Sequence, residues 1–88
     1  MQALRSSDPV ATKTLEECIK DHHIADIEYV EATGERDRVR IRPAFIRFNR
    51  SEHLVIWGMP VGADHWEELL LDGVVAVTDT GEVFTPGW

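Results

Sequence analysis

The sequence predicts a mainly β domain with one short N-terminal α-helix and five strands that form a small bent barrel. One amphipathic run near the start is followed by five short runs in which apolar residues alternate with polar ones or fill the run. Turn-forming residues, among them Gly34 and Gly73, separate these runs. A chain of 88 residues makes one domain of this kind, close to the size at which stability becomes marginal.

The helix is expected over residues 14–21, where Thr14 and Glu17 have the spacing of a capping box. So short a helix persists only if its apolar face docks on a sheet. This face consists of Leu15, Cys18 and Ile19. Residues 1–11 lack periodicity and are expected to form a flexible arm, which leaves residues 12–88 as the folded domain.

The longest strand is predicted over residues 36–48, where charged and apolar side chains alternate. Before Pro43 the apolar face has the odd-numbered residues, such as Ile41. Beyond it the apolar face has the even-numbered residues, such as Ile46, so the phase of the alternation changes between them. A bulge tolerates a proline and supplies the one extra residue that such a change requires. We therefore expect one long strand, bent at Pro43, whose Ile41 faces the core.

Four further strands are expected, over residues 25–29, 53–57, 65–71 and 74–77. The second of these is apolar on both faces and therefore belongs inside the sheet. Thr80 and Gly81 are then expected to turn the chain into a tail. The tail residues Val83, Phe84 and Trp88 either pack on the barrel or form an exposed apolar patch that binds a partner.

The charge of the chain is unevenly distributed. A formal net charge of −7 opposes general affinity for nucleic acid, which requires clustered lysines and arginines. Yet six of the nine basic residues lie between Arg36 and Arg50, so one basic strand crosses an otherwise acidic protein. This asymmetry is the electrostatic feature on which a functional hypothesis can rest.

Two arrangements of the basic strand have opposite functional meanings. We define the arginine comb as Arg38, Arg40 and Arg42. A hairpin that keeps the apolar faces together puts Asp26 and Glu28 beside the comb, where ion pairs worth up to about 1 kcal/mol each would neutralise it. If the arginines instead turn away from these carboxylates, they line one surface and can bind phosphates through paired hydrogen bonds.

Other kinds of chemistry find little support in the sequence. A single cysteine, Cys18, excludes an intrachain disulfide and agrees with a reducing compartment. The four histidines lack metal-ligand spacing, and there is no catalytic triad order and no phosphate-binding glycine loop. We expect neither an enzyme nor a metal or cofactor. No run approaches the roughly 20 apolar residues of a membrane span, and no signal peptide is evident, so a cytoplasmic protein is expected.

Several segments, in their order and spacing, resemble the WYL domain of bacterial transcriptional regulators. They are residues 15–19 with Ile27, Glu28 and Tyr29; Gly34; Arg40 with Pro43; residues 53–57; and residues 69–74 with Val77 and Phe84. The resemblance covers residues 15–84 and implies a barrel of the SH3-like or Sm-like type. It also implies a bacterial or phage regulator that senses a nucleotide or single-stranded nucleic acid and controls an attached DNA-binding unit.

The chain departs from the WYL pattern at the family's characteristic positions. Glu52 and His53 stand before Leu54 where the family has its Trp-Tyr pair. Leu70 and Gly73 occupy the positions of two arginines in the family's ligand patch. The chain is thus similar to a divergent, stand-alone member of the family.

Two functional hypotheses from different classes follow. The first is a regulatory barrel in which arginines bind phosphate and aromatic rings stack on bases. Its candidate ligand-binding residues are Arg38, Arg40, Arg42, Arg47, Arg50, Tyr29, His53 and Trp57. The second is a protein interaction module, or a homo-oligomer, that uses the acidic surface and the apolar tail.

Overall fold

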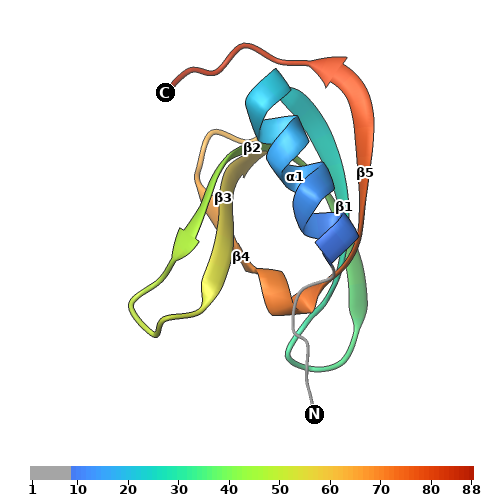
Figure 1. The fold of residues 1–88 in the computed structure, drawn as a ribbon, viewed down its shortest axis with the longest axis vertical. Helices are drawn as coiled ribbons and strands as arrows, with labels where there is room; N and C mark the ends of the chain where they lie inside the picture. The colour runs from blue at the N-terminus through green and yellow to red at the C-terminus, as the bar shows by residue number, and fades with distance from the viewer. Residues whose placement is uncertain (1–8) are drawn as a thin grey trace.

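One helix lies against a strongly bent sheet of five strands in the computed structural model, which describes residues 9–88. The elements are α1 (Pro9–Asp21), β1 (His23–Val30), β2 (Arg36–Phe48), β3 (Leu54–Pro60), β4 (Glu67–Leu70), the 3₁₀ turn η1 (Leu71–Gly73) and β5 (Val74–Val83). The strands are antiparallel in the order β4-β3-β2-β1-β5, and the sheet is not closed. Figure 1 shows the sheet curving around α1. The predicted fold class is confirmed.

The helix begins five residues earlier than predicted. Pro9 suits a first helical position because its fixed φ is already helical and its missing N–H has no helical partner there. Thr14 lies inside the helix, and its hydroxyl donates a hydrogen bond to the carbonyl of Val10 at 3.0 Å. The predicted capping box is therefore wrong, and residues 9–11 of the predicted arm are helical. The rest of the arm lies outside the described residues.

The apolar stripe of α1 explains this early start. Ala11 is buried and extends the stripe by one turn beyond Leu15 and Cys18, so the additional turn gains contact with the core. Leu15 and Cys18 are fully buried and Ile19 packs against the core, as predicted. The buried core consists of Ala11, Leu15, Cys18, Ala25, Ile27, Ile41, Ile56, Leu71 and Val74.

The predicted bulge in β2 lies at Ala44. Pro43 is opposite Gly58 of β3, and Phe45 is opposite Trp57, so Ala44 has no partner in the register. Ile41 is fully buried in the core, and Ile46 packs against the same core beyond the bulge. The other face of β2 presents the arginine comb before the bulge and the side chains of residues 45 and 47 after it.

The predicted turn at Thr80 and Gly81 is wrong, because β5 continues to Val83. His23 is paired with Val83 and Ala25 with Asp79, so three β5 residues bulge out opposite one residue of β1. Gly81 has φ +74°, a left-handed conformation that glycine adopts without strain. The same conformation is common in tight turns, which is why the sequence resembles a turn here. A turn-like sequence here bends a strand instead of ending it.

Candidate functional site

Two members of the arginine comb, Arg38 and Arg40, are paired with carboxylates. Arg38 lies 3.7 Å from Asp26 and 3.8 Å from Glu28, across the predicted β1–β2 hairpin. Arg40 Nη2 lies 2.6 Å from an oxygen of Glu82. This last contact was not predicted, because residue 82 was assigned to a tail rather than to β5. The structure is nearer to the first of the two arrangements, but only Arg38 pairs with Asp26 and Glu28 as that arrangement requires.

Arg42 is engaged by the backbone instead of by carboxylates. Its guanidinium donates hydrogen bonds to the carbonyls of Met59, Pro60 and Ala63. These carbonyls belong to the end of β3 and the loop that follows it. Arg42 therefore holds this loop against β2, and its donors are occupied by the protein itself.

A groove of about 590 Å³ brings together three of the predicted site residues, Arg47, Arg50 and Trp57. The Arg47 guanidinium lies over the Phe45 ring, 4.9 Å from its centroid, and 6.0 Å from the Trp57 ring. Within residues 9–88, no carboxylate lies within 4.0 Å of a side-chain nitrogen of Arg47 or Arg50. The remaining walls of the groove are Phe48, Asn49, Ser51 and Glu68.

Tyr29 and His53 lie outside this groove. The Tyr29 hydroxyl, on β1, donates a hydrogen bond to Asp37 at 3.3 Å. Partial burial, and then the negative charge of Asp37, raise the pKa of this phenol. His53 is exposed, and its backbone N–H donates to the Asn49 side chain at 3.0 Å in the turn before β3. Neither ring joins Trp57 in a stacking surface.

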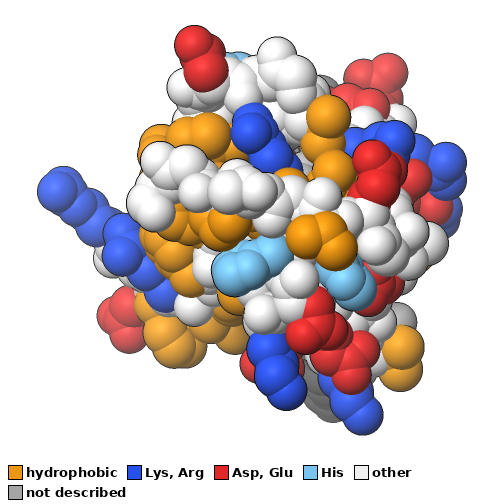
Figure 2. Space-filling view, turned by 90° about the horizontal axis from the view of Figure 1, so that it is seen from above, with side chains coloured by type: hydrophobic (Ala, Val, Ile, Leu, Met, Phe, Trp, Pro, Cys, Tyr) orange, Lys and Arg blue, Asp and Glu red, His pale blue; other side chains and the backbone are white. Residues whose placement is uncertain are grey.

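A row of five aromatic rings crosses from the groove to the C-terminal tail, and we call it the aromatic row. In order it consists of Trp57, Phe45, Trp66, Trp88 and Phe84, with successive centroids 6.4, 6.2, 5.0 and 5.8 Å apart. These separations are favourable for tilted aromatic pairs. Figure 2 views the end crossed by the tail, where hydrophobic side chains gather beside Lys and Arg side chains.

Sequence reasoning named Trp57 as a ligand-binding residue and Phe84 and Trp88 as part of a possible partner-binding tail, but it did not find Phe45 or Trp66. The row takes its members from β2, β3, the loop before β4 and the tail, so no local pattern unites them. A usable signal was present, since the row contains all three tryptophans of the chain. The predicted tail residues differ in burial: Phe84 is buried, whereas Val83 is 72% and Trp88 47% exposed.

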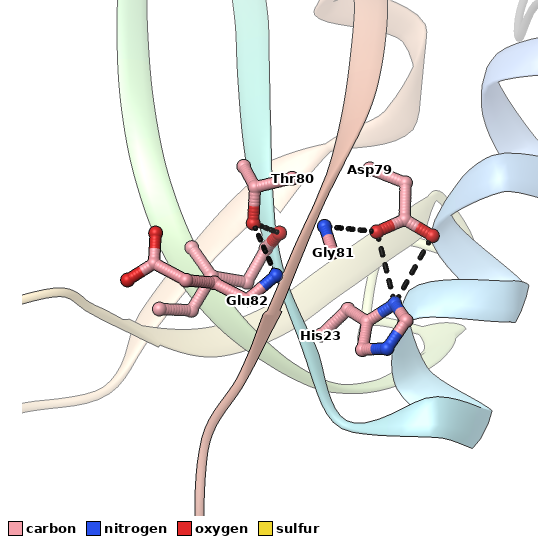
Figure 3. Close-up of polar contacts among 6 residues, drawn as sticks. His23, Asp79, Thr80, Gly81 and Glu82 are labelled. Carbon is pink, nitrogen blue, oxygen red and sulfur yellow. Dashed lines mark hydrogen bonds and ion pairs between the residues drawn. The ribbon is translucent and has the colours of Figure 1, made fainter.

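A polar cluster fixes the β5 bulge from which the tail departs (Figure 3). Asp79 accepts a hydrogen bond from the Gly81 N–H at 2.8 Å, and its carboxylate oxygens lie 3.0 and 3.2 Å from His23 Nδ1. The Gly81 N–H and then His23 lower the pKa of Asp79. The Thr80 hydroxyl donates to the Ile24 carbonyl at 2.7 Å and accepts from the Glu82 N–H. These contacts hold the bulge against β1.

Cys18 is fully buried near this cluster. Burial first, and then the negative charges of Asp79 and Glu17, raise the pKa of its thiol to about 11. Nucleophilic cysteines require a lowered pKa, because the thiolate is the reacting form. Cys18 is therefore a buried core residue rather than a reactive thiol.

The raised pKa predicts a stability change at alkaline pH. The folded protein holds the thiol proton more tightly than the unfolded chain, whose cysteine has the ordinary pKa of 9.0. This stabilisation is complete below pH 9 and is lost as the pH rises through about 11. Urea unfolding from pH 8 to 11 should show a loss on the order of 2 kcal/mol that Cys18→Ala lacks. Equal pH slopes in both proteins would contradict the burial of this thiol.

Comparison with known proteins gives no match, either to a family model or to a curated protein. In the part of the chain that the structure describes, no group of three or more His, Cys, Asp or Glu side chains is placed to hold a metal ion. Across the same residues, no helix combines the length and apolar character needed to cross a membrane. The candidate sites are therefore the groove and the aromatic row.

Proposed function

We propose that this protein is a small, non-enzymatic regulatory domain that binds a nucleotide or a short single-stranded nucleic acid in the groove beside Arg47 and Arg50. One observation carries the proposal: two arginines that have no carboxylate partner within residues 9–88 line the same groove as the Trp57 ring. Guanidinium groups bind phosphate oxygens through paired hydrogen bonds, and an indole face stacks on any base. The resemblance to WYL domains supports a cytoplasmic regulatory role.

The charge around the groove sets the expected strength of binding. Among residues 9–88, two cations line it, and the Glu68 carboxylate forms part of the same walls. The whole chain carries a formal net charge of −7. Binding is therefore weak and sensitive to salt. If both arginines contact phosphates of a single strand, the logarithm of the association constant falls with the logarithm of salt concentration at a slope of about −1.4.

Fluorescence anisotropy with labelled hexathymidylate, and competition by ATP, tests the proposal. Arg50→Glu is expected to weaken binding by about tenfold or more, because it replaces an attraction to phosphate with a repulsion. Arg40→Glu is the matched control, since the carboxylate of Glu82 already neutralises Arg40. Glu68→Gln should strengthen binding several-fold by removing the opposing charge. Absence of wild-type binding at low salt, or equal losses in Arg50→Glu and Arg40→Glu, would refute the proposal.

The aromatic row favours a second function, interaction with another protein. Phe45, Trp66 and Trp88 are 36%, 38% and 47% exposed, although large aromatic side chains are more often mostly buried. Contiguous exposed apolar side chains on a small domain are typical of interaction surfaces. This candidate agrees with the expectation of an interaction module that uses the tail.

A further inference from the structure

We infer that the aromatic row is a docking surface for a proline-rich segment of a partner protein that carries a lysine or arginine beside its prolines. The inference goes beyond nucleotide binding, because it concerns Phe45, Trp66 and Trp88, which do not line the groove. Trp57 is the one residue that belongs to both surfaces. Three observations identify this partner: the hydrogen-bonding groups of the row, the angles between its rings and the charges beside it.

The hydrogen-bonding groups of the row are donors without protein partners. Within residues 9–88, the indole N–H groups of Trp57, Trp66 and Trp88 donate no hydrogen bond to another residue. An indole can donate but cannot accept. A polyproline II segment has the complementary character, because its carbonyls form no internal hydrogen bonds and its prolines have no N–H. The indole N–H groups of the row can therefore donate hydrogen bonds to the free carbonyls of such a segment.

The ring angles favour puckered rings over a continuous stack of flat ones. Successive rings along the row are inclined by 31°, 38°, 53° and 47°. Rings inclined in this way do not form one flat platform. Successive stacked bases require nearly parallel faces, whereas the separate pyrrolidine rings of an extended segment can each pack on one aromatic face. Aromatic-lined surfaces bind proline-rich segments in this way, with little loss of entropy because the segment is already extended.

Charges of both signs lie beside the row: the Arg47 guanidinium is 4.9 Å from the Phe45 centroid, and the Glu68 carboxylate offers a site for a basic residue of the partner. Glu68 is opposite Trp57 in the β3–β4 register and is exposed. Within the described residues, no Lys, Arg or His nitrogen lies within 4.0 Å of its carboxylate. Glu67, the next residue along β4, lies 3.6 Å from His65. A lysine or arginine next to the prolines would find an unpaired carboxylate here, and the net charge of −7 would speed its approach.

Titration of the ¹⁵N-labelled wild type with a ten-residue peptide of eight prolines and two arginines tests the inference. The three indole N–H resonances are expected to shift together as the peptide binds. A peptide with alanine in place of proline should bind at least about tenfold more weakly, because it must first be ordered. Indole resonances that do not move at millimolar peptide would overturn the inference, as would equal affinity for the alanine peptide.

Variants then locate the binding on the row. Trp66→Ala should weaken peptide binding about tenfold, as for a central aromatic contact. Trp66→Phe, which keeps a ring but removes the donor, should weaken it roughly two- to tenfold. Val75→Ala is the control, since this exposed side chain of β5 lies outside both the row and the groove. Unchanged affinity in Trp66→Ala, or an equal loss in Val75→Ala, would overturn the assignment to the row.

Charge variants separate this inference from nucleotide binding. Glu68→Gln should lower the affinity for the arginine-containing peptide several-fold and raise the affinity for hexathymidylate. The Glu68 carboxylate attracts the peptide and repels the oligonucleotide. Arg50→Glu should weaken oligonucleotide binding by about tenfold or more and leave the affinity for the peptide unchanged or higher. If hexathymidylate shifts the Trp66 and Trp88 indoles and the peptide does not, or if sedimentation shows a dimer that excludes the peptide, the row has a different occupant and the inference fails.

Discussion

Replacing Ile41 with alanine is expected to lower the free energy of unfolding by about 2 to 5 kcal/mol. The Ile41 side chain is fully buried and lies on β2, opposite Ala25 of β1 and Pro60 of β3. Truncation removes apolar contacts and leaves a cavity in the layer between the sheet and α1. A small domain has only about 5 to 15 kcal/mol of stability, so this loss is a large fraction of the whole.

Urea unfolding followed by circular dichroism measures this loss. Ile41→Val should cost only about 0.5 to 1.5 kcal/mol, because one methyl group is removed. Phe48→Ala, at a side chain that is 65% exposed, serves as the surface control and should have a much smaller effect. An unchanged midpoint for Ile41→Ala would show that the opposite face of β2 is buried.

Replacing Gly58 with alanine is expected to destabilise the protein by about 2 to 4 kcal/mol, although it adds a single methyl group. A Cβ at this position would lie 2.5 Å from the Arg42 carbonyl oxygen and 3.0 Å from two carbons of the Ile41 side chain. The nearest of these atoms belongs to the backbone, so the β2–β3 pairing at the bend must move. The loop that Arg42 holds would move with it.

Thermal and urea unfolding of Gly58→Ala and Gly87→Ala gives the comparison. A Cβ at Gly87 would meet no atom within 4 Å, so this control should be at least as stable as the wild type, by up to about 1 kcal/mol. Both substitutions lower the entropy of the unfolded chain equally, so the difference between them reports the clash alone. Equal stability of the two variants would mean that the backbones of β2 and β3 do not approach so closely at the bend.

The features that sequence reasoning predicted well are those with a long local pattern. The alternation over residues 36–48 predicted β2, its bend and the burial of Ile41, because a period of two extended over the whole run. The pairing of Arg38 with Asp26 and Glu28 followed from keeping the apolar faces of one hairpin together. Local rules suffice where partners are joined by a short turn.

The features that were missed depend on contacts between distant parts of the chain. The helix start was misplaced because burial of Ala11 favours an extra turn more than a capping box favours Thr14. The end of β5 was misplaced because the Thr80 and Gly81 turn signal is used for a bulge against β1. The aromatic row could not be assembled at all, since Trp66 and Trp88 meet only in the folded chain.

Ala44 is one extra residue in β2, and its presence decides which of the later side chains in the strand face the solvent. Side chains alternate between faces, so the loss of one residue here would exchange the faces of everything that follows in the strand. Phe45 and Arg47 would then turn toward the core, and Ile46 would turn outward. Substitutions across the exposed surface of this hairpin are individually tolerable, but insertions and deletions are not. Descendants of this chain should therefore vary in composition along β2 while they keep its residue count.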